Sequence, residues 1–272
     1  MGSFRELNEA TTANYGPTQV SGVHQSPTQP APYLEDMPSV MLVGSVPLES
    51  LTAHFQPVVA LRTGKTFAFE AVPHCEAEGL TDREELFARA AFEKKVGQLG
   101  RAVRAVAFTE CPSIPVFVSV HPHELKESLL IRPDDPICGH DAEVFLQVAQ
   151  PAYSPMCLHV LSEVSSRSGI SLVLDDFGGA ASSLRQAVEL MPAFVKLDAE
   201  LIREIDRIPR KRTVVYAVVQ MCMDLGIQVM AKGIETELEA RVLLDCGVTY
   251  GEGPLMGQPT VLPSVSKWRG PR

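Results

Sequence analysis

About eight short apolar runs, most of them separated by helical stretches, constrain the fold of this chain more than any other feature of its sequence. Each run is too short for a full helix and is rich in Val, Leu or Phe, which indicates a buried strand. Repeated strand–helix units predict a parallel sheet covered by helices on both faces. We therefore predict an α/β fold, a closed (β/α)8 barrel of the TIM type, with an open doubly wound sheet as the alternative. The predicted strands are 54–61, 66–72, 115–120, 143–149, 171–177, 193–198, 227–233 and 248–253, and the predicted helices between the later strands are 153–168, 182–191, 211–225 and 235–246.

The first two strands differ from the rest because the segment between them favours a tight turn. Thr63 and Gly64 suit a hairpin, so we predict that this first strand pair is antiparallel. The stretch 82–108 has helical periodicity and good helix formers, which predicts a helix capped by Thr81 or Asp82. No GxGxxG or GxxxxGK[ST] loop follows any strand, which disfavours a nucleotide-binding fold of those types.

We predict that the two ends of the chain lie outside the folded domain. Residues 1–37 are rich in Thr, Ser, Gln, Pro and Gly, and such a segment buries too little apolar surface to offset its ordering entropy. We therefore predict a disordered N-terminal tail at 1–37, the barrel domain at 38–265 and a C-terminal tail at 266–272.

Charge and composition exclude several classes of partner. The formal net charge of −9 disfavours binding to a nucleic-acid polymer, which needs a basic face, and the basic residues at 207–212 fit a solvated helix start. No apolar run approaches the roughly 20 residues that cross a bilayer, and the N-terminus lacks a secretory pattern. We expect no membrane contact and a cytoplasmic location. The six cysteines form no CxxC pair and indicate free thiols in a reducing compartment.

Polar residues follow the apolar part of most predicted strands. In a barrel, the carboxyl ends of the strands meet at one mouth, so these side chains are predicted to converge there. In chain order they are Glu70, His74, Ser119, His121, Gln147, Gln150, Asp175, Asp176, Lys196, Asp198, Lys232, Glu235 and Glu252.

Asp175 and Asp176 give the strongest single signal for a site. They follow an apolar run in a position suited to burial, and ionised carboxylates are costly to bury unless they are paired or bind a metal. The alternative is a helix N-cap beyond the strand, since Asp is favoured there. Glu70 and Lys196 favour the site, because each also stands in an apolar strand, although Lys196 could instead extend to solvent from the barrel rim.

Four motifs carry a resemblance to a known family. The segment "FQPVVALRTGKTFAFEAV" resembles the opening hairpin of the EAL family of bacterial cyclic di-GMP phosphodiesterases, with Glu70 opening the EAL signature. The segments "LVLDDFGGAASSL", "FVKLDAELIREID" and "AKGIETELEARVLLDCGVTYGEGPLMGQP" resemble later parts of that family, in the same order. The resemblance covers roughly residues 39–263 and implies a modified TIM barrel with an antiparallel first strand pair.

The resemblance also implies a site. An active family member binds two divalent ions, usually Mg²⁺ or Mn²⁺, which activate a water that cuts one phosphodiester of cyclic di-GMP and yields linear pGpG. By resemblance, Glu70, Asp175 and Asp176 are metal ligands, and Asp175 bridges the two ions. Lys196 would hold the attacking water, and Glu235 would support the surrounding shell. The ligand contacts that the resemblance implies are Gln56, Glu70, His74, Asp175, Asp176, Lys232, Glu252 and Pro259.

The sequence departs from the family pattern at the metal positions. Ser119 stands where the family has a metal-binding Asn, and Gln147 and Lys232 stand where it has Glu. Because divalent cations need anionic or well-placed oxygens, and because an ammonium group repels a nearby cation, we predict that at least one metal site is lost. The other departures are Gln150 for an acid, Glu252 for Gln, His74 for Arg and Met256 for an aromatic residue.

These departures predict a catalytically degenerate EAL-like domain that acts as a bacterial cyclic di-GMP receptor or as a protein-interaction regulator. The alternative is a weak metal-dependent cyclic di-GMP phosphodiesterase that produces pGpG. No cofactor is expected, except Mg²⁺ or Mn²⁺ if activity remains. Cyclic di-GMP, a protein partner and a second copy of the chain are the candidate partners. Lys232 could take the place of a metal by pairing with Asp176, Asp175 or Glu252.

Overall fold

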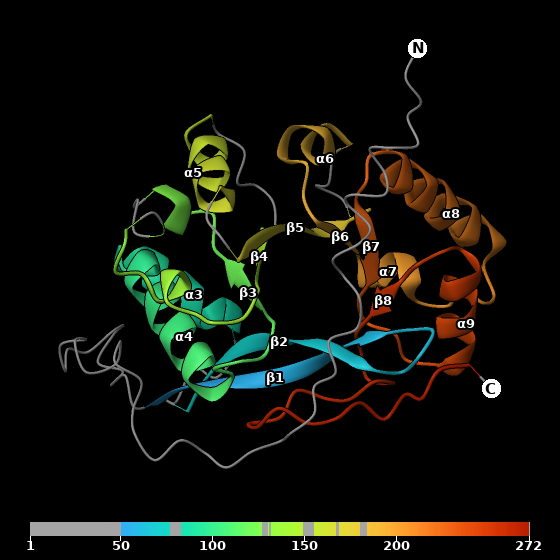
Figure 1. The fold of residues 1–272 in the computed structure, drawn as a ribbon, viewed down its shortest axis with the longest axis horizontal. Coiled ribbons are helices and arrows are strands. Elements are labelled where there is room, and N and C mark those ends of the chain that lie inside the picture. The colour runs from blue at the N-terminus through green and yellow to red at the C-terminus, as the bar shows by residue number, and fades with distance from the viewer. Residues whose placement is uncertain are drawn as a thin grey trace.

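Eight strands form a closed barrel at the centre of the structure (Figure 1). The structure is a computed structural model and describes residues 50–76, 83–126, 130, 132–148, 155–166, 169–179 and 184–271. The strands are β1 (Leu51–Ala60), β2 (Thr66–Cys75), β3 (Val116–Val120), β4 (Val144–Val148), β5 (Ile170–Phe177), β6 (Phe194–Leu197), β7 (Gln228–Ala231) and β8 (Tyr250–Gly251). They follow one another around the barrel in sequence order, which confirms the predicted barrel and rules out the open sheet.

The first strand pair is antiparallel, as predicted. Gln56 of β1 lies opposite Glu70 of β2, and β1 closes the barrel by a second antiparallel contact with β8. All other neighbouring strands are parallel. The turn between β1 and β2 contains Gly64 at φ 69°, a left-handed conformation that favours glycine. A Cβ at this position would lie 2.5 Å from the backbone of Arg269, so the turn also needs the small residue for packing.

Helices cover the outside of the barrel (Figure 1). They are α3 (Arg83–Phe92), α4 (Val96–Glu110), α5 (Pro155–Ser165), α6 (Leu184–Leu190), α7 (Ala199–Ile202), α8 (Pro209–Asp224) and α9 (Glu237–Asp245). The prediction of one helix over 82–108 is wrong, because Lys94 adopts φ 57° and separates α3 from α4. The predicted caps Thr81 and Asp82 lie outside the described residues. In the part of the chain that the structure describes, no helix combines the length and apolar character needed to cross a membrane.

Alternate residues of the strands fill the barrel in two layers, because successive strand residues point to opposite faces. The first layer is apolar: the rings of Phe117, Phe145 and Phe194 pack with centroids 4.3 to 6.1 Å apart. The second layer lies two residues further toward the carboxyl ends of the same strands, and it is polar. The polar layer contains Glu70, Ser119, Gln147, Asp175, Lys196, Lys232 and Glu252.

The connection from β3 to β4 is fastened to α4 by a buried arginine. Its described residues contain two short 3-10 helices, η2 (Glu124–Lys126) and η3 (Pro136–Cys138). Arg104 Nη1 donates to Glu124 Oε2 at 2.7 Å, and Arg104 Nε and Nη2 donate to the two oxygens of Asp135 at 3.0 and 2.7 Å. All three side chains are buried. A two-pronged contact of this kind fixes both the position and the direction of the connection.

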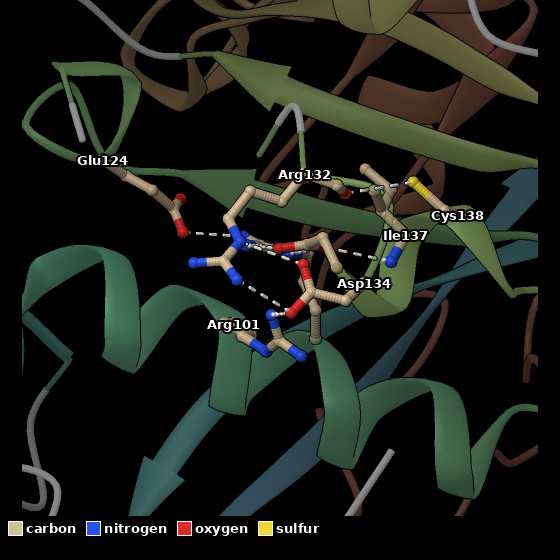
Figure 2. Close-up of polar contacts among 8 residues, drawn as sticks. Arg101, Glu124, Arg132, Asp134, Ile137 and Cys138 are labelled. Carbon is tan, nitrogen blue, oxygen red and sulfur yellow. Dashed lines mark hydrogen bonds and ion pairs between the residues drawn. The ribbon is translucent and has the colours of Figure 1, made fainter. Parts of the chain in front are cut away.

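A second ion cluster on the same connection is exposed. Figure 2 shows Asp134 between Arg101 and Arg132, whose guanidinium groups lie 2.8 and 3.0 Å from its carboxylate. The Asp134 side chain is 51% exposed, so water screens these contacts. The two clusters therefore differ in burial although they share α4 and the same connection.

The chain after β8 packs against the barrel, in contrast to the predicted tail at 266–272. Trp268 is buried, and its indole N–H donates to the carbonyl of Leu61 at 2.8 Å. Ser266 is buried as well. The packed domain thus extends past the predicted boundary at 265, because the indole ring fills the core between β1 and the helices near the C-terminus. The predicted tail at 1–37 and the predicted domain start at 38 lie outside the described residues.

Candidate functional site

Lys196 lies at the centre of a buried group of side chains, Glu70, Gln147, Lys196 and Glu252, which we call the inner cluster. Its Nζ donates to Glu70 Oε2 at 3.1 Å and to Glu252 Oε1 at 2.8 Å. The lysine side chain has 0% exposure, and Nζ lies 5.5 Å from the centre of the Phe117 ring. The alternative that Lys196 extends to solvent from the rim is wrong, because two carboxylates and an aromatic face hold its charge inside the barrel.

Both carboxylate oxygens of Glu70 are occupied. Oε2 accepts from Lys196, and Oε1 accepts from Gln147 Nε2 at 2.8 Å. The same Gln147 nitrogen lies 3.3 Å from Ser119 Oγ. An ionised Glu at position 147 would repel Glu70, whereas Gln donates to it. With its N–H group directed at Glu70, Gln147 leaves Oε1 buried without a hydrogen-bond partner, and Glu252 Oε2 is buried in the same state.

The inner cluster holds two carboxyl groups and one ammonium group, and the pKa values separate accordingly. Burial alone would raise the pKa of Glu70, but the charge of Lys196 and the hydrogen bonds around the carboxylate lower it to about 2. Burial and the neighbouring charge of Glu70 raise the pKa of Glu252 well above its ordinary value, against the effect of Lys196. Burial lowers the pKa of Lys196, but Glu252 and Glu70 outweigh it and raise that pKa overall. The cluster therefore pairs an ionised Glu70 with a charged Lys196, and it favours the protonated form of Glu252 more than water does.

Glu252→Gln is expected to stabilise the domain at neutral pH. A carboxyl group whose folded pKa is raised stabilises the fold below its unfolded pKa of 4.5, and this contribution is lost as the pH rises toward the folded value. Gln at position 252 can accept from Lys196 and donate to Glu70, and it needs no proton. We expect the variant to melt about 2–4 °C higher than wild type at pH 8. Near pH 4 the variant and wild type should melt at the same temperature. A shift of the same size at both pH values would contradict the titration of Glu252.

A second group, which we call the outer cluster, joins Lys232 to Asp175 and Asp176. The Lys232 ammonium group contacts Asp176 Oδ1 directly and lies 3.5 Å from Asp175 Oδ1. Consecutive residues of a regular strand point to opposite faces, but the register between β5 and β6 shifts after Leu174 and Asp176 adopts φ 54°. This irregularity turns both carboxylates toward one lysine. The two aspartates lie within β5 and join the outer cluster instead of capping a helix.

The ion-pair partners of Lys232 match the predicted partners in part. Its predicted pairing with Asp175 or Asp176 is confirmed. The third predicted partner, Glu252, pairs with Lys196 instead. Each lysine therefore serves two carboxyl groups, one pair inside the barrel and one pair nearer the surface.

Two further predicted ligand contacts, Gln56 and His74, make their contacts outside the clusters. Gln56 Nε2 donates to the backbone carbonyl of Gly257 at 3.3 Å. His74 stacks on His54 of the neighbouring strand, with ring centroids 4.5 Å apart. His54 was not among the predicted site residues; its signal is its place opposite Val72 in the antiparallel pair, on the same face as His74.

Glu235 lies apart from both clusters. It is exposed, and among the described residues no hydrogen bond or ion pair joins its carboxylate to either cluster. The residue that organises this turn is Glu239, whose carboxylate accepts the backbone N–H groups of Glu204, Glu235 and Thr236. Glu239 was not among the predicted site residues, although Thr236 and Glu239 have the spacing of a capping box.

The remaining candidates are peripheral. Pro259 is half-buried, next to the segment that bridges β1 at Thr260. Asp198 caps α7 by accepting the backbone N–H of Glu200 at 2.7 Å, so it serves the helix and not the mouth. His121 stacks on Phe87. Gln150 lies outside the described residues.

Comparison with known proteins decides the family of this barrel. Residues 44–259 match the EAL domain family, which is well over half of the chain. The chain belongs to the EAL domain family. The resemblance found in the sequence is confirmed, and the EAL signature position, Glu70, is the residue that joins Lys196 to Gln147 in the inner cluster.

Relatives of this EAL domain include named phosphodiesterases. The cyclic di-GMP phosphodiesterase RocR of Pseudomonas aeruginosa is 26% identical over 256 residues, covering 82% of this chain and 61% of RocR. The uncharacterized protein y4lL of Sinorhizobium fredii is 28% identical over 223 residues, covering 77% of this chain and 27% of y4lL. The chain thus spans less than two thirds of the length of these curated relatives.

Solved structures support the same fold. Klebsiella pneumoniae BlrP1 in a manganese and cyclic di-GMP complex at pH 6 is 26% identical, with a TM-score of 0.67, covering 82% of this chain and 59% of that chain. The EAL domain of Xanthomonas citri FimX, in complex with cyclic di-GMP, has a TM-score of 0.67 at 19% identity, covering 80% of this chain and 92% of that chain. The likeness to FimX shows the fold alone.

The donor set of this EAL domain does not fit two divalent metal ions. Glu70 has both oxygens engaged by Lys196 and Gln147, and Lys232 stands against the two aspartates of β5. In the part of the chain that the structure describes, no group of three or more His, Cys, Asp or Glu side chains is placed to hold a metal ion. An ammonium group this close to each carboxylate pair repels an approaching cation.

Proposed function

We propose that this EAL domain is a non-hydrolytic regulator that binds cyclic di-GMP as a receptor and acts through a protein partner or a second copy of the chain. The observation that carries the proposal is the placement of two ammonium groups, Lys196 Nζ in the inner cluster and Lys232 Nζ in the outer cluster. Two-metal hydrolysis needs carboxylates that are available to hold both ions and a water activated by them. Here the carboxylates neutralise lysines instead.

Gln147 and Lys196 of the inner cluster, together with the neighbouring Ser119, explain how hydrolysis can be lost while ligand binding is kept. Gln147 and Ser119 supply no negative charge, and Lys196 forms two ion pairs inside the barrel. Two of the three N–H groups of Lys196 donate to Glu70 and Glu252, and the side chain is fully buried, which disfavours its holding an attacking water. It keeps Glu70 ionised and oriented, which is a structural role.

Cyclic di-GMP is the ligand that the family supports. BlrP1, at 26% identity, is named as a complex with it. At the mouth of this barrel, Gln56 and His74 offer hydrogen-bonding groups, and Lys232 offers a cation. The Lys232 side chain is 26% exposed, so a phosphate can reach its ammonium group and pair with it in place of a carboxylate.

Titration calorimetry with cyclic di-GMP tests the proposal. We expect binding heat of equal size in EDTA and in Mg²⁺, because the site uses no metal, and we expect no pGpG by chromatography after prolonged incubation. A flat trace at high micromolar ligand would remove the receptor role and leave regulation through protein contacts. Binding that requires Mg²⁺ would contradict the metal-free site.

The second candidate is a weak metal-dependent phosphodiesterase. The observation in its favour is that the chain retains Glu70, Asp175, Asp176 and Lys196, and that the Asp176 side chain is 45% exposed, where a divalent ion could compete with Lys232. Formation of pGpG in excess Mn²⁺, abolished by Asp175→Ala, would establish this activity and overturn the first proposal.

A further inference from the structure

We infer that Lys232 is a tethered cation that keeps a latent divalent-metal site closed: Asp175 and Asp176 bind Mn²⁺ or Mg²⁺ only when the Lys232 ammonium group is removed. The inference rests on the proposed non-hydrolytic function and adds how the site stays free of metal. It concerns the outer cluster alone, because the two clusters differ in how accessible their lysines are.

The two aspartates form a preorganised oxygen pair. The shift in register after Leu174 and the left-handed backbone of Asp176 turn both carboxylates to one side of β5. The backbone N–H of Asp176 donates to Asp175 Oδ1 at 2.8 Å and fixes the direction of that carboxylate. This geometry is a property of the β5 backbone, so it persists when the lysine is shortened. Carboxylate oxygens on a rigid strand are ligands that hard divalent cations accept, with water filling the remaining positions.

The charge of the outer cluster favours a cation with more than one charge. One ammonium group stands against two carboxylates, which leaves one negative charge uncompensated within the cluster. The buried Lys196 also acts electrostatically on Asp175 and offsets part of this excess. A divalent ion would neutralise the aspartate pair completely, and the attached lysine is what competes with it.

Exposure makes the outer lysine the one that can be displaced. The Lys232 side chain is 26% exposed and the Asp176 side chain is 45% exposed, whereas Lys196 has 0% exposure. Water and small ions therefore reach Lys232 and Asp176 directly, while Asp175, at 12% exposure, lies deeper. Removing Lys196 would leave buried carboxylates without a cation, but removing Lys232 leaves a pair that solvent can hydrate and that a metal can enter.

Electron paramagnetic resonance of free Mn²⁺, titrated with the full chain, tests this inference. We expect Lys232→Ala to tighten Mn²⁺ binding by about tenfold or more relative to wild type, since a repelling charge is removed next to two carboxylates. Lys232→Gln, which keeps most of the side-chain volume without the charge, should behave in the same way. Adding Asp176→Ala to Lys232→Ala should return binding to the wild-type level. Lys65→Ala, at an exposed lysine in the β1–β2 turn at the other end of the barrel, is the matched control and should change nothing.

Each outcome bears on a separate claim. If both Lys232 variants fold, as circular dichroism will show, and bind Mn²⁺ no better than wild type, the latent site is wrong while the non-hydrolytic function stands. If wild type itself binds Mn²⁺ as tightly as the variants, the lysine does not close the site. If wild type also converts cyclic di-GMP to pGpG in the same buffer, the proposed function is wrong as well.

Discussion

Arg104→Ala is expected to lower the free energy of unfolding by about 3–5 kcal/mol, because it leaves two buried carboxylates without their cation. Glu124 and Asp135 are both buried, and Arg104 supplies three hydrogen bonds to them at 2.7 to 3.0 Å. The same pair of contacts raises the pKa of the guanidinium group despite its burial, so the charge is present at every practical pH. Urea unfolding at pH 7 measures the change.

The chain offers a matched control three residues earlier on the same helix. Arg101 pairs with Asp134 at 2.8 Å, but Asp134 is 51% exposed (Figure 2). Arg101→Ala is therefore expected to cost about 0–1 kcal/mol. If Arg104→Ala costs no more than Arg101→Ala, the buried contacts do not hold the β3–β4 connection. The variant Arg104→Met with Glu124→Gln and Asp135→Asn should recover much of the loss, since it removes the charges together.

The barrel could be predicted from the sequence because residues that are adjacent in the chain mark each strand and the first turn. Each strand is a short run of Val, Leu and Phe, and the hairpin turn is marked by Thr63 and Gly64. The polar layer was predictable for the same reason, since residues two apart on a strand share a face. Glu70 and Lys196 could thus be assigned to one mouth although they are 126 positions apart in the sequence.

The features that escaped prediction depend on contacts between distant segments. Nothing near Lys196 in the sequence shows that Glu252 balances its charge, so its complete burial could not be predicted. The irregular backbone at Asp176 decides which way two carboxylates point, and it is set by pairing with β6. Trp268 belongs to the core only because the chain returns to Leu61, far away in sequence. In each case a tertiary contact overrides the local pattern.

Lys196→Met is expected to lower the free energy of unfolding at pH 7 by about 3–5 kcal/mol, because the inner cluster loses its cation. The pH dependence should also change sign. In wild type the pKa of Glu70 is lowered from 4.5 to about 2, so its stabilising contribution is present above pH 4.5 and is lost as the pH falls toward 2. Without Lys196, burial raises the pKa of Glu70 as it does that of Glu252. Both carboxyl groups then favour the folded state below pH 4.5 and oppose it as the pH rises.

Urea unfolding of Lys196→Met at pH 5 and at pH 7 separates the loss of charge from a simple loss of packing. The deficit relative to wild type should shrink at pH 5, where the two carboxyl groups take up protons, whereas a cavity would cost the same at both values. Adding Glu70→Gln and Glu252→Gln should restore much of the stability at pH 7, because no buried carboxylate remains. Lys232→Met is the matched control: it also removes a lysine from two carboxylates, but in a cluster that is partly exposed, and it should cost about 1 kcal/mol or less. A deficit of Lys196→Met that is independent of pH would mean that the lysine acts by filling space and not by balancing charge.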